Sequence, residues 1–213
     1  MSDPALLALI SPDRRLALGY APAAARRLFL GLYALDAKLA SIVHTAREPV
    51  LGQMKLAWWR DQLAKPASAR PRGEPVLAAL APWGDAGRAL SGLVDGWEVL
   101  IGEESPAQTA LADFVAARGG ACAALAGLVG ADPEAARRAG QGWALGDLGL
   151  QLGASEPLRQ LAAKADWRSP RLNRAMRPLL IHHGLARRSI NKDFAHPGPA
   201  SLVLAIRLGL LGI

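Results

Sequence analysis

Residues 33–44 read Tyr33-Ala34-Leu35-Asp36-Ala37-Lys38-Leu39-Ala40-Ser41-Ile42-Val43-His44, and residues 53–61 read Gln53-Met54-Lys55-Leu56-Ala57-Trp58-Trp59-Arg60-Asp61. Apolar side chains recur three or four positions apart through the first stretch and just before it, at Leu28, Leu32, Leu35, Leu39 and Ile42. This period is typical of one buried face of an α-helix. Between the stretches, Pro49 disfavours helical backbone in the residue before it. The sequence therefore predicts two consecutive helices, from just after Pro22 to about His44 and from about Val50 to Leu63.

Composition predicts an all-α protein. The chain has 213 residues, of which 51% are hydrophobic and 5% aromatic, and it is rich in the helix formers Ala, Leu and Arg. No run of alternating β-branched residues is bounded by turn signals. The length suits one domain, residues 1–213, with a short apolar C-terminal tail at 201–213. That tail is shorter than the roughly 20 residues that cross a bilayer, and Arg207 interrupts it.

The formal net charge of +7 favours an anionic partner, such as a diphosphate, an acidic lipid surface or an acidic protein. Nucleic acid is not expected, because no binding motif accompanies the charge. The single cysteine, Cys122, excludes an intrachain disulfide and favours a reducing compartment. No basic segment precedes an apolar run at the start, so a cytoplasmic protein is expected, with a peripheral position on the inner membrane face as an alternative.

Further helices are marked by their ends. Asp85 is a plausible N-cap for a helix whose apolar stripe includes Trp97. A long helix is expected from about Pro106 to Val129, and Asp132-Pro133 combines a cap with proline at the first helical position. Ser169-Pro170 repeats that opening signal, and Pro178 should then kink or end the last helix.

Four arginines follow at spacings of three, Arg168, Arg171, Arg174 and Arg177. On a helix this spacing would keep several of them on one face, which makes them candidate anion-binding residues. The alternatives are a solvated helix face with snorkelling side chains and contact with an anionic lipid surface beside the Leu-rich tail.

In order and spacing, several segments resemble those of the squalene/phytoene synthase family, the head-to-head prenyl transferases. They are Leu32-Tyr33-Ala34-Leu35, Glu48-Pro49, Lys55-Leu56-Ala57-Trp58-Trp59-Arg60-Asp61, Val94-Asp95-Gly96-Trp97-Glu98 and Gly142-Trp143-Ala144-Leu145. The resemblance implies an isoprenoid-synthase-like helical bundle around a central cavity. It also implies that aromatic side chains line this cavity, namely Tyr33, Trp58, Trp59, Trp97 and Trp143.

Active members of this family resemble other isoprenoid synthases in carrying two acidic motifs that hold Mg²⁺ ions against a diphosphate. The first motif falls here on Ala40, Ser41 and His44, where no carboxylate remains. The second falls on Ala144, Asp147 and Gln151, so that only Asp147 keeps a potential ligand. We therefore assign no catalytic residue and no metal site to these degenerate motifs.

The departures resemble those of a subfamily that includes the mitochondrial complex I assembly factor. They favour a protein without Mg²⁺-dependent prenyl transfer, a pseudoenzyme without a cofactor, that acts by binding. It would serve as an assembly or scaffold factor for a protein partner, or as a binder of an isoprenoid or lipid.

The alternative is an active prenyl transferase with a rearranged diphosphate and Mg²⁺ site. Asp95 and Glu98, an acidic pair at i and i+3, would contribute to that site together with Asp147 and the arginine-rich segment. A third alternative is a protein held at an anionic membrane by its basic segment and apolar tail.

Overall fold

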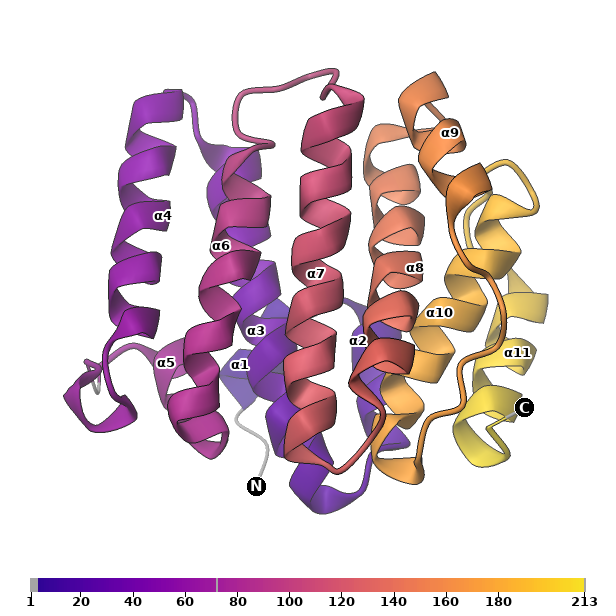
Figure 1. The fold of residues 1–213 in the computed structure, drawn as a ribbon, viewed down its shortest axis with the longest axis horizontal. Helices are drawn as coiled ribbons and strands as arrows, with labels where there is room; N and C mark the ends of the chain where they lie inside the picture. Colours follow the sequence, from indigo (N-terminus) through magenta and orange to yellow (C-terminus); the bar gives the residue numbers. More distant parts are fainter. Residues whose placement is uncertain (1–3, 72, 213) are drawn as a thin grey trace.

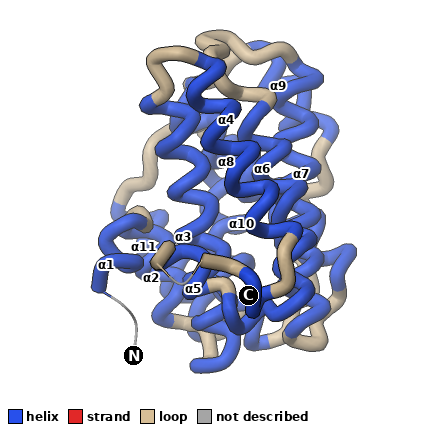
Figure 2. Tube along the Cα trace, turned by 90° about the vertical axis from the view of Figure 1, so that its left-hand side faces the viewer, coloured by secondary structure: helices blue, strands red, loops and turns tan. Residues whose placement is uncertain are grey.

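The structure, a computed structural model, describes residues 4–71 and 73–212. These residues form helices joined by loops and contain no β-strand, which confirms the all-α prediction (Figure 1, Figure 2). The helices are α1 (Pro4–Leu9), α2 (Pro12–Gly19), α3 (Ala23–Thr45), α4 (Pro49–Ala64), α5 (Pro75–Ala79), α6 (Ser91–Glu98), α7 (Gln108–Leu128), α8 (Pro133–Leu152), α9 (Glu156–Lys164), α10 (Arg177–Ile190) and α11 (Pro199–Leu210).

The helices pack as a bundle around α3. Figure 1 shows α4, α6, α7, α8 and α10 following one another across the molecule, with α3 behind α6 and α7. Helix α4 lies at one edge of this row, and α11 lies at the opposite edge against α10. One main hydrophobic core joins side chains from Leu6 in α1 to Phe194 after α10. The connection from α4 to α5 includes one 3-10 turn, Ala67–Ala69, and its Arg72 lies outside the described residues.

The predicted helix pair is confirmed with small shifts at its ends. Helix α3 ends at Thr45, one residue beyond the prediction, and α4 begins at Pro49. The apolar stripe of α3 is buried, and Leu32, Leu35 and Leu39 are 0% exposed. The Asp132 cap is also confirmed, since its carboxylate accepts hydrogen bonds from the backbone N–H groups of Glu134 at 2.9 Å and Ala135 at 3.3 Å.

Two helix-start predictions are wrong. Asp85 does not cap a helix, because it lies inside a 3-10 segment, Ala81–Leu90, that bends where Gly84 takes a positive φ of 52°. Ser169-Pro170 opens no helix, since residues 165–173 have no regular structure. Pro178 then stands in the first turn of α10, where a missing N–H costs nothing, so it begins the helix that it was expected to end.

Helices α3 and α7 have the length and apolar character of membrane-crossing segments. Both are core helices of the bundle, with 67% of the apolar window of α3 and 50% of that of α7 buried. The predicted apolar tail is mostly helical, as α11, and its last residue, Ile213, lies outside the described residues.

A stripe of small residues on α8 allows α10 to approach closely. A Cβ atom built on Gly142 would meet Nδ1 of His183 at 2.7 Å, and one built on Gly146 would meet Cβ of Ala186 at 2.5 Å and its Cα at 2.9 Å. These positions are one helical turn apart, so both lie on the face that α10 covers. The contact brings His182 and Ala186 of α10 beside α8, where they form part of the cavity wall described below.

We expect Gly146→Ala to destabilise the protein, although alanine is intrinsically the better helix former. The added methyl group meets backbone of α10, so the two helices must separate, at a cost of about 1–3 kcal/mol for overpacking. The matched control is Gly120→Ala in α7, where a Cβ would meet only an arginine nitrogen at 3.8 Å. That change should stabilise by about 0.5–1 kcal/mol. Urea unfolding measures the free energy of unfolding of both variants. Equal changes in Gly146→Ala and Gly120→Ala would contradict the close approach of α8 and α10 at Gly146.

Candidate functional site

A cavity of about 470 Å³ lies between α3, α8 and α10, and residues of α1 and α2 also form part of its wall. Most of its wall is apolar, from Leu9, Ala37, Ala40, Trp143, Leu150, Leu185, Ala186 and Pro197. The polar wall residues are Ser11, Asp13, Arg14, Ser41, Asp147, Gln151, His182 and Ser189. Its charged members are two acids and one base, so the cavity has no excess of positive charge.

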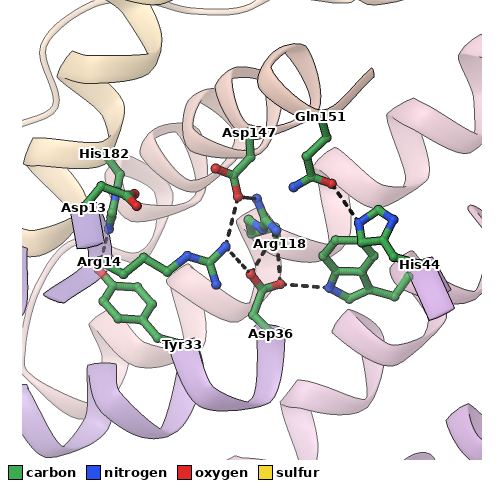
Figure 3. Close-up of polar contacts among 10 residues, drawn as sticks. Asp13, Arg14, Tyr33, Asp36, His44, Arg118, Asp147, Gln151 and His182 are labelled. Carbon is green, nitrogen blue, oxygen red and sulfur yellow. Dashed lines mark hydrogen bonds and ion pairs between the residues drawn. The ribbon is translucent and has the colours of Figure 1, made fainter. Parts of the chain in front are cut away.

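The structure brings the two degenerate motifs face to face across this cavity. Ala40 and Ser41 of α3 line one wall, and Asp147 and Gln151 of α8 line the other. His44 turns aside and pairs with Gln151, with Nε2 3.1 Å from Oε1 (Figure 3). Ala144 is buried on α8 and is not part of the cavity wall. The two predicted motifs therefore meet here, with the His44–Gln151 pair beside small residues and Asp147 as the one carboxylate among their six positions.

Beside the cavity, a cluster of four charged side chains joins α2, α3, α7 and α8. Arg118 donates to both oxygens of Asp36 at 3.1 and 2.9 Å and to Asp147 at 2.7 Å. Arg14 contacts the same two carboxylates, at 2.8 Å from Asp36 and 3.0 Å from Asp147 (Figure 3). Trp97 Nε1 also donates to Asp36 at 2.8 Å. We call Arg14, Asp36, Arg118 and Asp147 the ion cluster, whose formal charges sum to zero.

The ion cluster lies in the protein interior. Arg118 and Asp36 are 0% exposed, and Arg14 is 8% exposed. The Arg118 guanidinium also lies 4.5 Å from the ring centre of Trp143 and 4.6 Å from that of Phe114. Burial alone would raise the pKa of Asp147, but Arg118 and Arg14 outweigh it and lower that pKa below its ordinary value. Asp147 is therefore ionised at neutral pH and held by guanidinium groups.

A second polar group lies beside α2 and is centred on His182. Nε2 of His182 shares a hydrogen bond with the Tyr33 hydroxyl at 2.7 Å, and its Nδ1 lies 3.8 Å from Asp13. The imidazole stacks on Trp143 at 4.7 Å between ring centres. Burial lowers the pKa of His182 to about 4 even though Asp13 acts in the opposite direction. His182 is thus a neutral, buried residue.

These residues do not fit the Mg²⁺ ions that the resemblance implies. Mg²⁺ needs carboxylate oxygens that are free to coordinate it. Asp147 is the one carboxylate among the six motif positions, and its Oδ2 already accepts from both arginines of the ion cluster. Within residues 4–71 and 73–212, no three His, Cys, Asp or Glu side chains gather in a way that could hold a metal ion.

Asp95 and Glu98 are also bonded to a cation of the protein. Arg60 of α4 donates to Asp95 at 2.7 Å and to Glu98. Their side chains belong to α6, and neither lines the cavity that Asp147 lines. The rearranged ion site of Asp95, Glu98 and Asp147 is therefore not assembled in this structure.

The five aromatic residues that were expected to line one cavity are distributed over the molecule. Trp143 is the only one of them on the wall of the α3–α8–α10 cavity. Trp58 and Trp59 border a separate pocket beside α4, and Trp97 borders another near the end of α6. Tyr33 is 0% exposed because it packs edge-on against Trp143 and His182.

The four arginines of the candidate anion site do not share a helix face. Arg168 lies in an irregular segment and pairs with Asp166 at 2.6 Å, and Arg171 follows it in the same segment. Arg174 belongs to a single 3-10 turn, and Arg177 starts α10 and donates to the Leu208 carbonyl at 3.3 Å. The spacing of three predicted a helix that the chain does not form, because two prolines, Pro170 and Pro178, bracket the segment.

Arg14, Arg118 and Asp36 were missed as site residues at the sequence level. Asp36 is 0% exposed and contacts both arginines of the ion cluster. Arg118 did carry a signal: it is the only charged residue between positions 114 and 131, within a run of Ala, Gly and Leu. A lone charge in a helix of that kind is buried only when it is paired. Arg14 carried no comparable signal.

One comparison with known proteins found a similarity, and it concerns the N-terminal part of the chain. Residues 8–96 match the sequence model of the squalene/phytoene synthase family, and this range covers α2, α3, α4, α5 and most of α6. No curated protein sequence and no solved structure matches the chain. The matched part includes the helix pair from which the resemblance was inferred. The chain is therefore similar to the squalene/phytoene synthase family over residues 8–96, which are less than half of its 213 residues.

Proposed function

We propose that this protein binds an uncharged isoprenoid or lipid chain in the α3–α8–α10 cavity and does not transfer prenyl groups with Mg²⁺. The observation that carries the proposal is the pairing of the motif positions with each other and with the ion cluster. Asp147 is held by Arg14 and Arg118, and Gln151 is held by His44. In the family, metal ions would lie between the two motif helices. In this chain, side-chain contacts between α3 and α8 take that place.

The cavity itself supports an apolar ligand. Its volume of about 470 Å³ lies in the range of small-molecule sites, which are mostly apolar with a few polar groups that orient the ligand. Asp13 and Asp147 lie on its wall, and they would repel a diphosphate that carried no metal ions. A hydroxyl or carbonyl head group could instead bond to Ser41 or Gln151. The ligand class that suits this wall is therefore a neutral chain with a small polar end.

The test compares farnesol and farnesyl diphosphate, with and without Mg²⁺. We expect farnesol to quench the fluorescence of Trp143 in a saturable way. Ala40→Phe, which fills the cavity from α3, should weaken farnesol binding by about tenfold or more, since overpacking costs about 1–3 kcal/mol. Ala116→Phe on the exposed side of α7 is the control and should leave farnesol binding unchanged.

Mg²⁺-dependent release of diphosphate from farnesyl diphosphate would overturn the proposal and establish the transferase alternative. Without carboxylate-held metal ions, the departing diphosphate loses its main electrostatic stabilisation, usually the largest catalytic term. We therefore expect no release above the buffer rate. Tighter binding of farnesyl diphosphate with Mg²⁺ than of farnesol would also favour the transferase.

An assembly or scaffold role is the second candidate, and a different observation favours it. Helix α4 exposes three large apolar side chains spaced by one turn, Val50 at 65%, Met54 at 65% and Trp58 at 41%. Monomeric proteins rarely leave such a stripe uncovered without a use for it. If a protein partner binds there, Met54→Asp should abolish the complex and Ala40→Phe should not.

A further inference from the structure

A second pocket lies at the other edge of the bundle, between α10 and α11, and its wall is strongly basic. Its volume is about 450 Å³, and four cationic side chains line it, Arg187, Arg188, Lys192 and Arg207. No Asp or Glu belongs to that wall. The apolar part comes from Leu180, Leu204 and Leu208. The pocket therefore combines an apolar floor with a cluster of like charges.

These four cations are available to an outside partner. In the described part of the chain, none of the four forms an ion pair, whereas the nearby acid Asp193 is already paired with Arg159 at 3.0 Å. Arg187, Lys192 and Arg207 are exposed. Arg187, Arg188 and Arg207 also lie in the last turns of their helices, where positive charge is favoured. The fold can thus carry this charge cluster at little cost.

Beside the pocket, α11 presents an uncovered apolar face. Val203 and Leu210 are each 67% exposed, Leu202 is 51% exposed and Ile206 is 38% exposed. Val203 and Leu210 are seven residues apart and so lie on the same side of the helix. Arg207 stands between this face and the pocket, since it is exposed on α11 and also lines the pocket. The apolar face and the cation cluster form one continuous surface, which we call the α10–α11 surface.

We propose that the α10–α11 surface docks on an anionic lipid bilayer, with lipid phosphates among the four cations and the apolar face of α11 in the interface. Helices with an apolar face beside basic residues lie in the plane of such interfaces. Charge complementarity selects an acidic bilayer over a neutral one, because each basic residue near the surface adds attraction. This site is separate from the α3–α8–α10 cavity, so its test does not depend on the ligand proposed for that cavity.

The experiment is sedimentation of the full chain with vesicles of phosphatidylcholine alone and with vesicles containing phosphatidylglycerol. We expect binding to the acidic vesicles that weakens as salt is raised. The triple change Arg187→Gln, Arg188→Gln and Lys192→Gln should weaken it about a hundredfold, at about fivefold for each charge. The matched control removes three cations near the opposite edge, Arg47, Lys55 and Lys65, by the same change to Gln. This control variant should lose less binding to the acidic vesicles, because only the net charge of the protein changes.

The apolar part is tested separately. Val203→Ser with Leu210→Ser should weaken acidic-vesicle binding by at least about tenfold. Val50→Ser with Met54→Ser on α4 is the control. These side chains are each 65% exposed, close to the 67% of Val203 and of Leu210. Both pairs are at the surface, and circular dichroism of each variant checks that helix content is unchanged.

Several outcomes would overturn the proposal. One is equal binding of the protein to neutral and acidic vesicles. Another is an equal loss of acidic-vesicle binding in the α4 and α11 serine variants. Displacement by millimolar inorganic phosphate with no effect of the α11 change would show a small-anion site. Binding to an oligonucleotide that depends on the cations alone would show a nucleic-acid surface. Loss of a dimer on the α11 change, without loss of vesicle binding, would show an interface between two copies of the chain.

Discussion

Arg118→Met is expected to destabilise the protein by about 3–5 kcal/mol, since removing one partner of a buried ion pair leaves an uncompensated charge. Arg118 is 0% exposed and donates to both carboxylates of the ion cluster. Its loss would leave Asp36 and Asp147 sharing only Arg14, with a net negative charge in the core. For a chain of this size, the melting temperature should fall by about 10 °C or more. Urea unfolding and calorimetry measure the two effects.

The control for this change is Arg60→Met. Arg60 also bridges two carboxylates, Asp95 and Glu98, but its side chain is 36% exposed. An exposed bridge contributes at most about 1 kcal/mol. If Arg118→Met and Arg60→Met lowered the free energy of unfolding by similar amounts, burial would not explain the expected effect of Arg118→Met.

A double-mutant cycle shows whether the ion cluster acts as a unit. Arg118→Met with Asp147→Asn leaves Arg14 paired with Asp36, so the cluster is again neutral. We expect the double variant to be more stable than the sum of the two single losses implies, with a coupling energy of about 1 kcal/mol or more. Simple additivity would show that the two residues do not interact as the geometry indicates.

Acid should destabilise the protein in a window that His182 sets. Burial lowers the pKa of His182 from 6.5 to about 4 in the folded protein. Between these values the unfolded chain binds a proton that the folded chain does not, so stability falls as the pH falls from 6.5 to 4. The loss approaches roughly 3 kcal/mol, since each pKa unit corresponds to about 1.4 kcal/mol. His183, whose pKa burial also lowers, adds to the loss in the same direction.

The lowered pKa of Asp147 acts in a different range. Its contribution is complete above the ordinary carboxyl pKa and is lost only as the pH falls below that value. The two effects can therefore be separated by following urea unfolding between pH 7 and 3.

His182→Phe combined with Tyr33→Phe removes both partners of the 2.7 Å hydrogen bond and keeps the aromatic contacts. Between pH 4 and 6.5, the free energy of unfolding of this double variant should depend less steeply on pH. The remaining dependence should be the contribution of His183. His196→Gln, a change in an exposed loop residue, should not alter the slope. An unchanged slope in the double variant would show that His182 is not the group that titrates.

Much of the fold could be predicted from local patterns. The stripe of Leu32, Leu35 and Leu39 predicted α3 because a helix that packs on one side repeats its apolar residues with the helical period. Asp132 and Pro133 predicted the start of α8, since an N-cap acts within its own turn. Between Asp166 and Met176 the pattern failed, because arginine spacing describes a helix only where the backbone can form one. Prolines at 170 and 178 prevent that here.

The sequence by itself determined the all-helical fold class, the likeness to squalene/phytoene synthases and the absence of carboxylates at Ala40, Ser41 and His44. These follow from residue identity and short spacing. Only the tertiary structure decided what fills the space between the two motifs. Arg14 and Asp147 are 133 positions apart, and no local signal links them. Their pairing depends on how α2, α3, α7 and α8 pack, because a buried charge is stable only where folding brings its counter-charge within a few ångströms.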